Sequence, residues 1–202
     1  LTERDPIITA KSIASLDHLS KGRVIFGIAG GWIREAMENH GADFKKRWSL
    51  VKENALFIRS LWKEETVAFN GEFSRLKGTI QQFPKPYTRG GPPIYIGSNH
   101  KKVASRVADY ADGWMPIYDR YEGENDPISD LKQSCREVGR DYREMTVLLF
   151  GAPYDHRLLD TLASEGYHGF IFLVPQERAN NISDVFEEIA SLKAQVIRNS
   201  AS

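Results

Sequence analysis

The sequence contains a single cysteine, Cys135, so no disulfide can form within the chain. A lone thiol also excludes a metal cluster built on several cysteines, and it is typical of a reducing compartment, so we expect a cytoplasmic protein. Long apolar runs are missing too. Stretches such as 170–174 are far too short to cross a bilayer, and the first residues do not have the pattern of a signal peptide. We therefore expect no membrane partner.

An excess of charge of one sign is also missing, because 27 basic residues balance 27 acidic ones. Nucleic-acid-binding proteins usually carry a basic excess, so no nucleic-acid partner is expected. The sequence has no H-E-x-x-H motif, no Walker loop, and no convincing Ser-His-Asp set, carboxylate pair or metal-ligand spacing. We expect no metal site, and any redox chemistry would reside in a bound cofactor.

The 202 residues are enough to bury one sizeable core, so a single domain is expected. The chain begins at Leu1 rather than at a methionine, which suggests a fragment or a processed product.

Short apolar runs alternate with helical patterns along most of the chain. A helix is expected at 6–19, a strand buried on both faces at 23–28 and a helix at 44–62. Further strands are expected at 94–96, 113–116, 146–150 and 169–173, and further helices at 100–110, 127–139, 157–165 and 182–197. Such alternation predicts five parallel strands joined by helical crossovers. A doubly wound open sheet is the structural alternative.

The region 66–90 interrupts this rhythm with short alternating runs around Asn70-Gly71, a dipeptide that favours a tight hairpin.

Several blocks resemble the bacterial luciferase-like monooxygenase family. The first are the T-A-K block at 5–11, the L-D-x-L-S block at 16–20 and the block 22–32, which runs from Gly-Arg through a strand into Gly-Gly-Trp. Matches that follow in the family's order are His40-Gly41, Arg47-Trp48, Pro92-Pro93-Ile94 before Gly97, Ala111-Asp112-Gly113-Trp114 and Glu165-Gly166.

This resemblance implies an α/β fold of the (β/α)8 TIM-barrel type, here a partial barrel. Residues 1–202 would form one domain carrying family strands 4 to 8, with the excursion at 66–90 and without the first three strands. The implied function is flavin- or F420-dependent hydride transfer or monooxygenation of a small organic substrate. The cofactor would be F420 or FMN, and the similarity of 149–153 to F420-type members favours F420. A non-catalytic flavin-binding or degenerate scaffold protein is the alternative.

Five parallel strands leave two open sheet edges, which invite pairing. We therefore predict a homodimer.

Two glycine-containing turns, Gly30-Gly31 and Gly97-Ser98-Asn99, follow expected strands and precede helices. Parallel barrels carry their active sites at the C-terminal ends of strands, and a helix N-terminus favours phosphate. The resemblance places the cofactor phosphate near Gly97, Ser98 and Asn99. It places Trp32 against the cofactor ring and makes Glu35 a further cofactor contact.

Each of these residues also has a plain structural interpretation. The glycines could simply shape tight turns, Trp32 could be packing, and Glu35 could be a solvated carboxylate at a helix start.

Catalytic residues remain unknown from the sequence. The resemblance puts the family's acid–base histidine and its strained cis peptide upstream of Leu1. His18 and His40 are expected to be structural, and Tyr154-Asp155-His156 to form an ordinary loop and helix cap.

Overall fold

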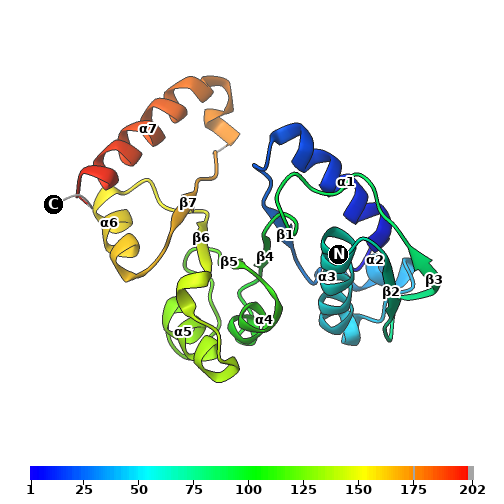
Figure 1. Ribbon diagram of the computed structural model, residues 1–202. Helices are drawn as coiled ribbons and strands as arrows, with labels where there is room; N and C mark the ends of the chain where they lie inside the picture. The colour runs from blue at the N-terminus through cyan, green and yellow to red at the C-terminus, as the bar shows by residue number, and fades with distance from the viewer. Residues whose placement is uncertain (175, 200–202) are drawn as a thin grey trace. The chain divides into compact units, whose positions relative to one another are not determined.

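The computed structural model describes residues 1–174 and 176–199. The chain divides into two compact units, one made of Leu1–Gly97 with Asp109–Asp112 and the other of Ser98–Ala108 with Gly113–Ser202. Figure 1 labels the elements of both units.

The elements of the first unit are α1 (Pro6–Ser20), β1 (Phe26–Ile28), α2 (Arg34–Asn39), the 3-10 helix η1 (Phe44–Lys46), α3 (Arg47–Lys63), β2 (Val67–Asn70), β3 (Arg75–Ile80) and β4 (Ile94–Gly97). The elements that follow are α4 (Val103–Tyr110), β5 (Gly113–Met115), α5 (Pro127–Val138), η2 (Tyr142–Glu144), β6 (Thr146–Phe150), α6 (His156–Glu165), β7 (Gly169–Ile171), η3 (Gln176–Asn181) and α7 (Ile182–Asn199).

Five of the strands form one sheet in the order β1-β4-β5-β6-β7. Within the first unit β1 runs parallel to β4, and within the second unit β6 runs parallel to both β5 and β7. This confirms the expected fold class, a mixed α/β chain with a parallel sheet of five strands. The remaining strands, β2 and β3, form an antiparallel hairpin inside the excursion expected at 66–90.

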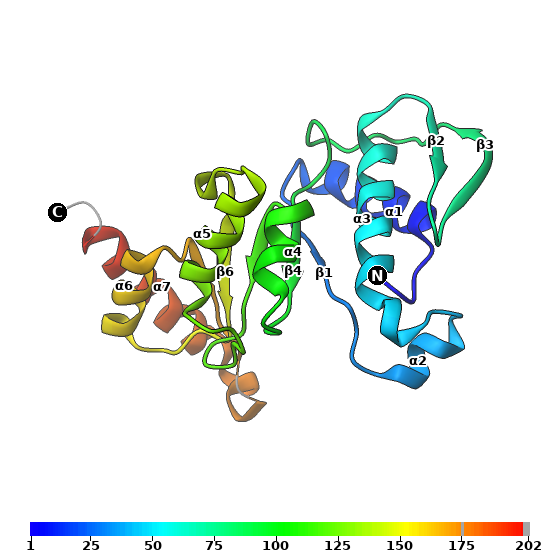
Figure 2. The ribbon, with the colours of Figure 1, turned by 90° about the horizontal axis from the view of Figure 1, so that it is seen from below.

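The core of the first unit lies between α1 and α3, which pack against each other (Figure 2). α1 is able to approach closely because Ala10 and Ala14, both fully buried, carry small side chains. The buried Trp62 indole of α3 donates to the Ala10 carbonyl at 3.0 Å, and its ring meets Phe26 of β1 edge-on. The interaction joins α1, α3 and β1.

A half-buried ion pair fixes the start of β4 to the same helix. Both Nη atoms of Arg59 donate to the Asp112 carboxylate, at 3.1 and 2.8 Å. The Asp112 carboxylate also accepts the Ile94 N–H at 2.8 Å, and the Asp112 N–H donates to the Ile94 carbonyl at 2.8 Å. Asp112 therefore connects the first residue of β4 to α3.

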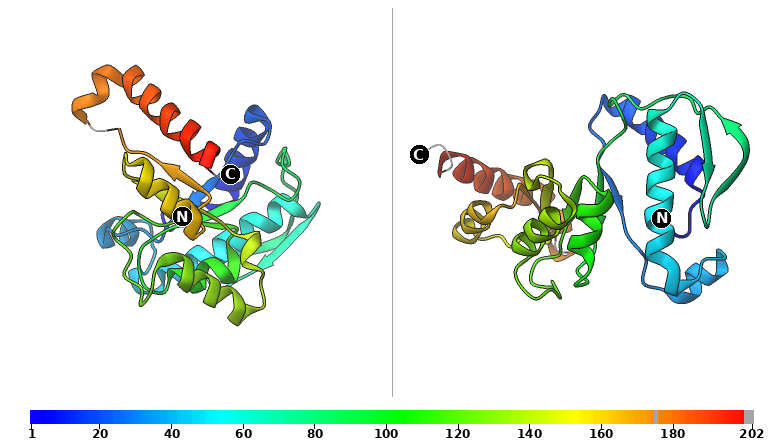
Figure 3. Two further views of the ribbon diagram at one scale, coloured as in Figure 1. Left: turned by 90° about the vertical axis from the view of Figure 1, so that its left-hand side faces the viewer. Right: turned by 60° about the horizontal axis from the view of Figure 1, so that its bottom comes forward.

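In the second unit the strands carry fully buried apolar side chains, among them Trp114 on β5 and Val147 on β6. β6 and β7 are joined at one end by His168, whose N–H donates to the Val147 carbonyl and whose Nδ1 accepts the Val147 N–H. α6 and α7 lie beside each other (Figure 3).

Three expectations about local structure need correction. β1 covers only 26–28 rather than 23–28, and its central Gly27 is exposed, so the strand is not buried on both faces. The reason is its edge position, since β4 is its one neighbour in the sheet. α4 begins at Val103 rather than near His100, and α2, expected only as a helix start at Glu35, spans Arg34–Asn39. No described helix is both long and apolar enough to cross a bilayer.

Candidate functional site

The two glycine turns lie at the same end of their strands. β1 and β4 are parallel with Ile28 opposite Ile96, Gly30 follows Ile28 by two residues, and Gly97 directly follows Ile96. Both turns therefore extend from the C-terminal ends of these strands, as expected. This is the end at which parallel β/α folds place their ligands.

Gly30 and Gly31 have structural reasons to be glycine. A Cβ on Gly30 would lie 2.7 Å from the Trp48 ring, so the absence of a side chain allows close packing. Gly31 adopts φ +74°, a backbone conformation that strains residues with a side chain. Shaping the turn accounts for both residues without a ligand, and the sequence had left this alternative open.

Gly97 differs from these two glycines. A Cβ there would meet only the Ile28 carbonyl oxygen, at 3.9 Å, which is ordinary van der Waals contact. Its φ is not in the positive region either. Neither packing nor backbone conformation requires a glycine here, so the position has room for an approaching group.

Trp32 and Glu35 lie just beyond the first turn and are turned to solvent. The Trp32 side chain is 85% exposed, which excludes the packing role that was its plain interpretation. Glu35 is exposed in the first turn of α2, where a carboxylate complements the helix dipole. An exposed indole beside a glycine turn offers an apolar face for stacking.

The loop Ser98–Lys102, here called the 98–102 loop, joins β4 to α4. Its oxygen acceptors are engaged within the protein. The Ser98 carbonyl accepts the Trp114 indole N–H at 2.9 Å, and the Asn99 carbonyl accepts the Glu122 N–H at 2.9 Å. The Asn99 side-chain oxygen accepts the Ile117 N–H at 2.8 Å. These oxygens accept hydrogen bonds from residues 114–122. The loop is therefore fixed to the rest of the second unit through its oxygen atoms rather than through its N–H groups.

Two donors of the 98–102 loop are left over. In the described part of the chain, the backbone N–H groups of Asn99 and Lys101 make no hydrogen bond. The loop leads into the N-terminus of α4, and the Lys101 and Lys102 side chains are exposed. Partial burial, followed by the charge of Arg106, lowers the pKa of His100. Free donors, a helix start and two exposed lysines together favour an anion here.

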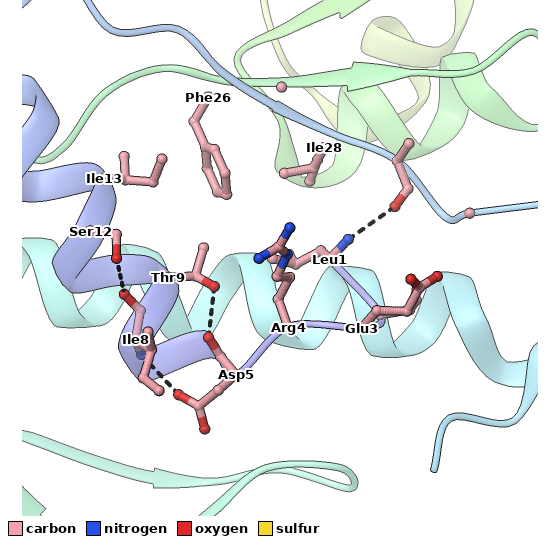
Figure 4. A pocket seen from close by; sticks show the side chains of 14 residues that line it. Leu1, Glu3, Arg4, Asp5, Ile8, Thr9, Ser12, Ile13, Phe26 and Ile28 are labelled. Atoms are coloured by element: carbon pink, nitrogen blue, oxygen red, sulfur yellow. Dashed lines mark hydrogen bonds between the residues drawn. The ribbon is translucent and has the colours of Figure 1, made fainter. Parts of the chain in front are cut away.

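A hollow in the first unit lies alongside β1 and has a volume of about 680 Å³. Figure 4 shows Phe26 and Ile28 pointing into it from β1 and Ile13 from α1, with the Arg4 side chain extending toward its centre. Of the predicted cofactor residues, only Gly31 lines it. The hollow therefore borders the first glycine turn and does not contain the 98–102 loop.

The sequence model of the family described as luciferase-like monooxygenase matches residues 1–191. This chain belongs to the luciferase-like monooxygenase family. The resemblance read from the sequence blocks is confirmed.

One protein with a similar sequence is the uncharacterized protein Rv0953c of Mycobacterium tuberculosis (strain ATCC 25618 / H37Rv). It is 31% identical over 189 residues, which are 94% of this chain and 66% of the relative. The luciferase-like chain therefore spans slightly less than two thirds of that relative's length.

Two solved structures share the fold. An F420-dependent secondary alcohol dehydrogenase, in complex with an F420-acetone adduct, superposes with a TM-score of 0.61 at 21% identity, covering 80% of this chain and 50% of that one. The oxygenating constituent of 3,6-diketocamphane monooxygenase from Pseudomonas putida, in complex with FMN, gives a TM-score of 0.57 at 18% identity, covering 82% and 50%. One fold thus accommodates both cofactors in these two proteins.

The histidines of the luciferase-like chain have structural surroundings. The His18 ring lies in the last turn of α1, ahead of β1, and contacts the Lys85 carbonyl and the Tyr87 ring. His40 Nδ1 lies 2.9 Å from the Ala36 carbonyl, and Asp155 caps α6 through the Leu158 N–H, as the sequence suggested. Among the described residues, no group of three or more His, Cys, Asp or Glu side chains could hold a metal ion.

Sequence reasoning missed the side chains behind the 98–102 loop. Trp114 was named only as part of a matched sequence block, and Tyr121 and Asp130 were not singled out. Tyr121 packs edge-on against Trp114 with ring centres 5.2 Å apart, and its hydroxyl donates to Asp130 at 2.7 Å. The one sequence signal for this network is the tryptophan of the Asp112-Gly113-Trp114 block.

Proposed function

We propose that the 98–102 loop binds the phosphate of F420 or FMN, and that the protein is an oxidoreductase acting on a small organic substrate by hydride transfer or monooxygenation. The observation that carries the proposal is the pair of free backbone N–H groups at Asn99 and Lys101, beside two exposed lysines and a helix start. Family membership supports the oxidoreductase class.

The donor set fits a phosphate. Backbone N–H groups and ammonium groups are donors without acceptor capacity, and a dianionic phosphate accepts several such bonds. Asn99 contributes its backbone N–H, since both of its oxygens accept bonds from Ile117 and Glu122. Ser98 can offer its hydroxyl proton, because its carbonyl is bonded to Trp114 and its hydroxyl oxygen accepts the His100 N–H. Gly97 leaves the space through which the phosphate would approach.

For the first glycine turn, taken within the first unit alone, we propose contact with an aromatic ring system of the flavin type. Gly30 and Gly31 set the course of the backbone, and the exposed Trp32 indole offers a face for stacking. Glu35 would lie at the edge of this surface, where its carboxylate could accept a hydrogen bond from the ring or the substrate. The bound cofactor supplies the hydride or oxygen chemistry, while these residues bind and orient it.

Titration with the two cofactors tests this proposal. We expect the absorbance and fluorescence of F420 or of FMN to change saturably when purified protein is added, and reduced cofactor to be consumed once a suitable acceptor is present. Binding without turnover would favour the non-catalytic scaffold alternative. Absence of binding by either cofactor would contradict the proposal.

We also propose that the chain forms a homodimer. The sequence predicted this dimer from the open edges of the sheet, whereas the exposed side chains favour the outer face of α1 as its interface. Ile8, Leu16 and Leu19 recur at helical spacing on α1 and are 68%, 50% and 82% exposed. The opposite face of the same helix already packs on α3 through Ala10 and Ala14. An apolar stripe of this kind marks an interaction surface.

A further inference from the structure

The 98–102 loop is held from behind by a second loop, residues 116–126, which follows β5. Ile117 and Glu122 of this second loop donate their N–H groups to Asn99, at 2.8 and 2.9 Å. Trp114, the middle residue of β5, donates its indole N–H to the Ser98 carbonyl. Each bond uses an oxygen of the 98–102 loop, so the position of the second loop sets where the free donors of the first loop point.

Tyr121 is the side chain that anchors the second loop. Its ring meets the Trp114 ring at 70° with centres 5.2 Å apart. Its hydroxyl donates to Asp130 Oδ2 at 2.7 Å, and Asn125 Nδ2 donates to the other carboxylate oxygen at 2.8 Å. Asp130 lies on α5, so a rigid helix is connected to the loop through Tyr121 and Asn125.

The backbone next to the Tyr121–Asp130 hydrogen bond has a glycine, Gly123, where a side chain would not fit. A Cβ on Gly123 would collide with the Tyr121 ring and with the Asp130 carboxylate. The loop can therefore pass close to both groups only because residue 123 has no side chain. Burial, followed by the hydrogen bond to Asp130, raises the pKa of Tyr121. The hydroxyl keeps its proton at neutral pH and remains a donor to Asp130.

We infer that Tyr121 is a positioning residue for anion binding: through Trp114 and the 116–126 loop it holds the 98–102 loop with its free N–H groups preorganised for a cofactor phosphate. This inference rests on the proposed function for the identity of the ligand. Its physical basis is that a loop already fixed in its binding conformation loses less conformational entropy when the ligand arrives.

The test compares Tyr121→Phe with Tyr142→Phe in the full chain. Both substitutions remove a hydroxyl from a half-buried tyrosine of the second unit, and Tyr142 donates to the Gly166 carbonyl at 3.0 Å, a bond that does not involve either loop. Asp130→Asn serves as the conservative variant, because its amide oxygen can still accept the Tyr121 hydroxyl. Two readouts are measured: dissociation constants for F420 and FMN, and hydrogen exchange, without ligand, of the His100 and Lys102 amides, which are hydrogen-bonded within the 98–102 loop.

We expect Tyr121→Phe to weaken cofactor binding by about 10-fold, the effect of one lost hydrogen bond to a charged group. The His100 and Lys102 amides of the 98–102 loop should exchange faster in this variant, because their hydrogen bonds depend on the loop staying in place. Asp130→Asn should fall between it and the wild type, and Tyr142→Phe should change neither readout even if it lowers Tm equally.

The exchange readout separates this inference from the proposed function. If neither cofactor binds the wild type, the proposed function fails, while faster exchange in Tyr121→Phe alone still supports the positioning role. If exchange in the 98–102 loop and cofactor affinity are the same in Tyr121→Phe and Tyr142→Phe, the positioning role is wrong.

Discussion

Gly30 and Gly97 occupy similar places in the sequence, each in a turn after a parallel strand, yet the structure gives them different reasons to be glycine. Gly30 is required by its neighbour, since a Cβ would lie 2.7 Å from the Trp48 ring. Gly97 has only the Ile28 carbonyl oxygen within 4 Å of such an atom. A sequence pattern cannot distinguish a glycine required by close packing from a glycine that leaves space for a ligand, because both appear as glycine in the same kind of turn.

Gly30→Ala should therefore destabilise the protein by about 1–3 kcal/mol, the usual cost of forcing a methyl group into a packed site. Urea unfolding followed by circular dichroism measures this. Gly78→Ala is the matched control, because a Cβ there meets nothing within 4 Å and its φ is not positive. Equal stability of the Gly30 and Gly78 variants would show that Trp48 does not restrict the turn.

Helices with explicit end signals were predictable almost to the residue. α1 begins at Pro6 after Asp5, whose carboxylate accepts the Ile8 N–H. α5 begins at Pro127 after Asp126 and ends before Gly139, which adopts φ +71°. In both cases the cap chemistry is local, so neighbouring residues alone determine where the helix starts.

The missed element boundaries depend on contacts that are remote or that compete with the helix. α4 was expected near His100, but the Ser98 hydroxyl accepts the His100 N–H and His100 Nδ1 accepts the Lys102 N–H. These side-chain bonds replace the helical ones and delay the helix to Val103. β1 is exposed at Gly27 because of its position in the sheet, which residues 23–28 do not encode.

Between α6 and β7, Tyr167 makes the stability of the second unit sensitive to alkaline pH. Burial, followed by the charges of Asp126 and Glu165, raises the pKa of Tyr167 above its ordinary value of about 10. Above that ordinary value the unfolded chain loses the phenol proton while the folded chain keeps it. Unfolding then releases a proton, so the free energy of unfolding falls as pH rises.

Tyr167→Phe should reduce this fall in the free energy of unfolding at alkaline pH. Chemical unfolding at several pH values between about 9 and 11 measures the slope. We expect the wild type to lose its stability advantage over the variant as pH rises. Arg143→Ala, at an ion pair on the protein surface, serves as a control for general electrostatic effects. Parallel stability curves for wild type and Tyr167→Phe would contradict the assignment.

At the scale of the whole molecule, the family and the parallel sheet could be predicted from the sequence because several ordered blocks carry them. The predicted site residues divide between the two units, with Gly30, Gly31, Trp32, Glu35 and Gly97 in the first and Ser98 and Asn99 in the second. The supports of the 98–102 loop could not be predicted, since Tyr121 lies 22 residues beyond Asn99 in the sequence and no local pattern connects the two.

Self-association belongs to the same scale. Leu19→Lys on the outer face of α1 should convert the proposed homodimer to a monomer, since a desolvated lysine in an apolar interface is costly. Sedimentation velocity measures the change. Val138→Lys, at a residue of α5 that is 50% exposed, is the control and should leave the mass unchanged. A wild-type protein that sediments as a monomer would overturn the proposed interface.

The most direct test of the account compares FMN with riboflavin, which carries the same ring system but no phosphate, by isothermal titration calorimetry. If the 98–102 loop holds the phosphate, FMN should bind about 10- to 100-fold more tightly than riboflavin, the effect of one or more charge-assisted hydrogen bonds. F420 and its phosphate-free chromophore should differ in the same direction, and Gly97→Leu should remove the preference. Equal affinities with and without the phosphate would contradict the central claim.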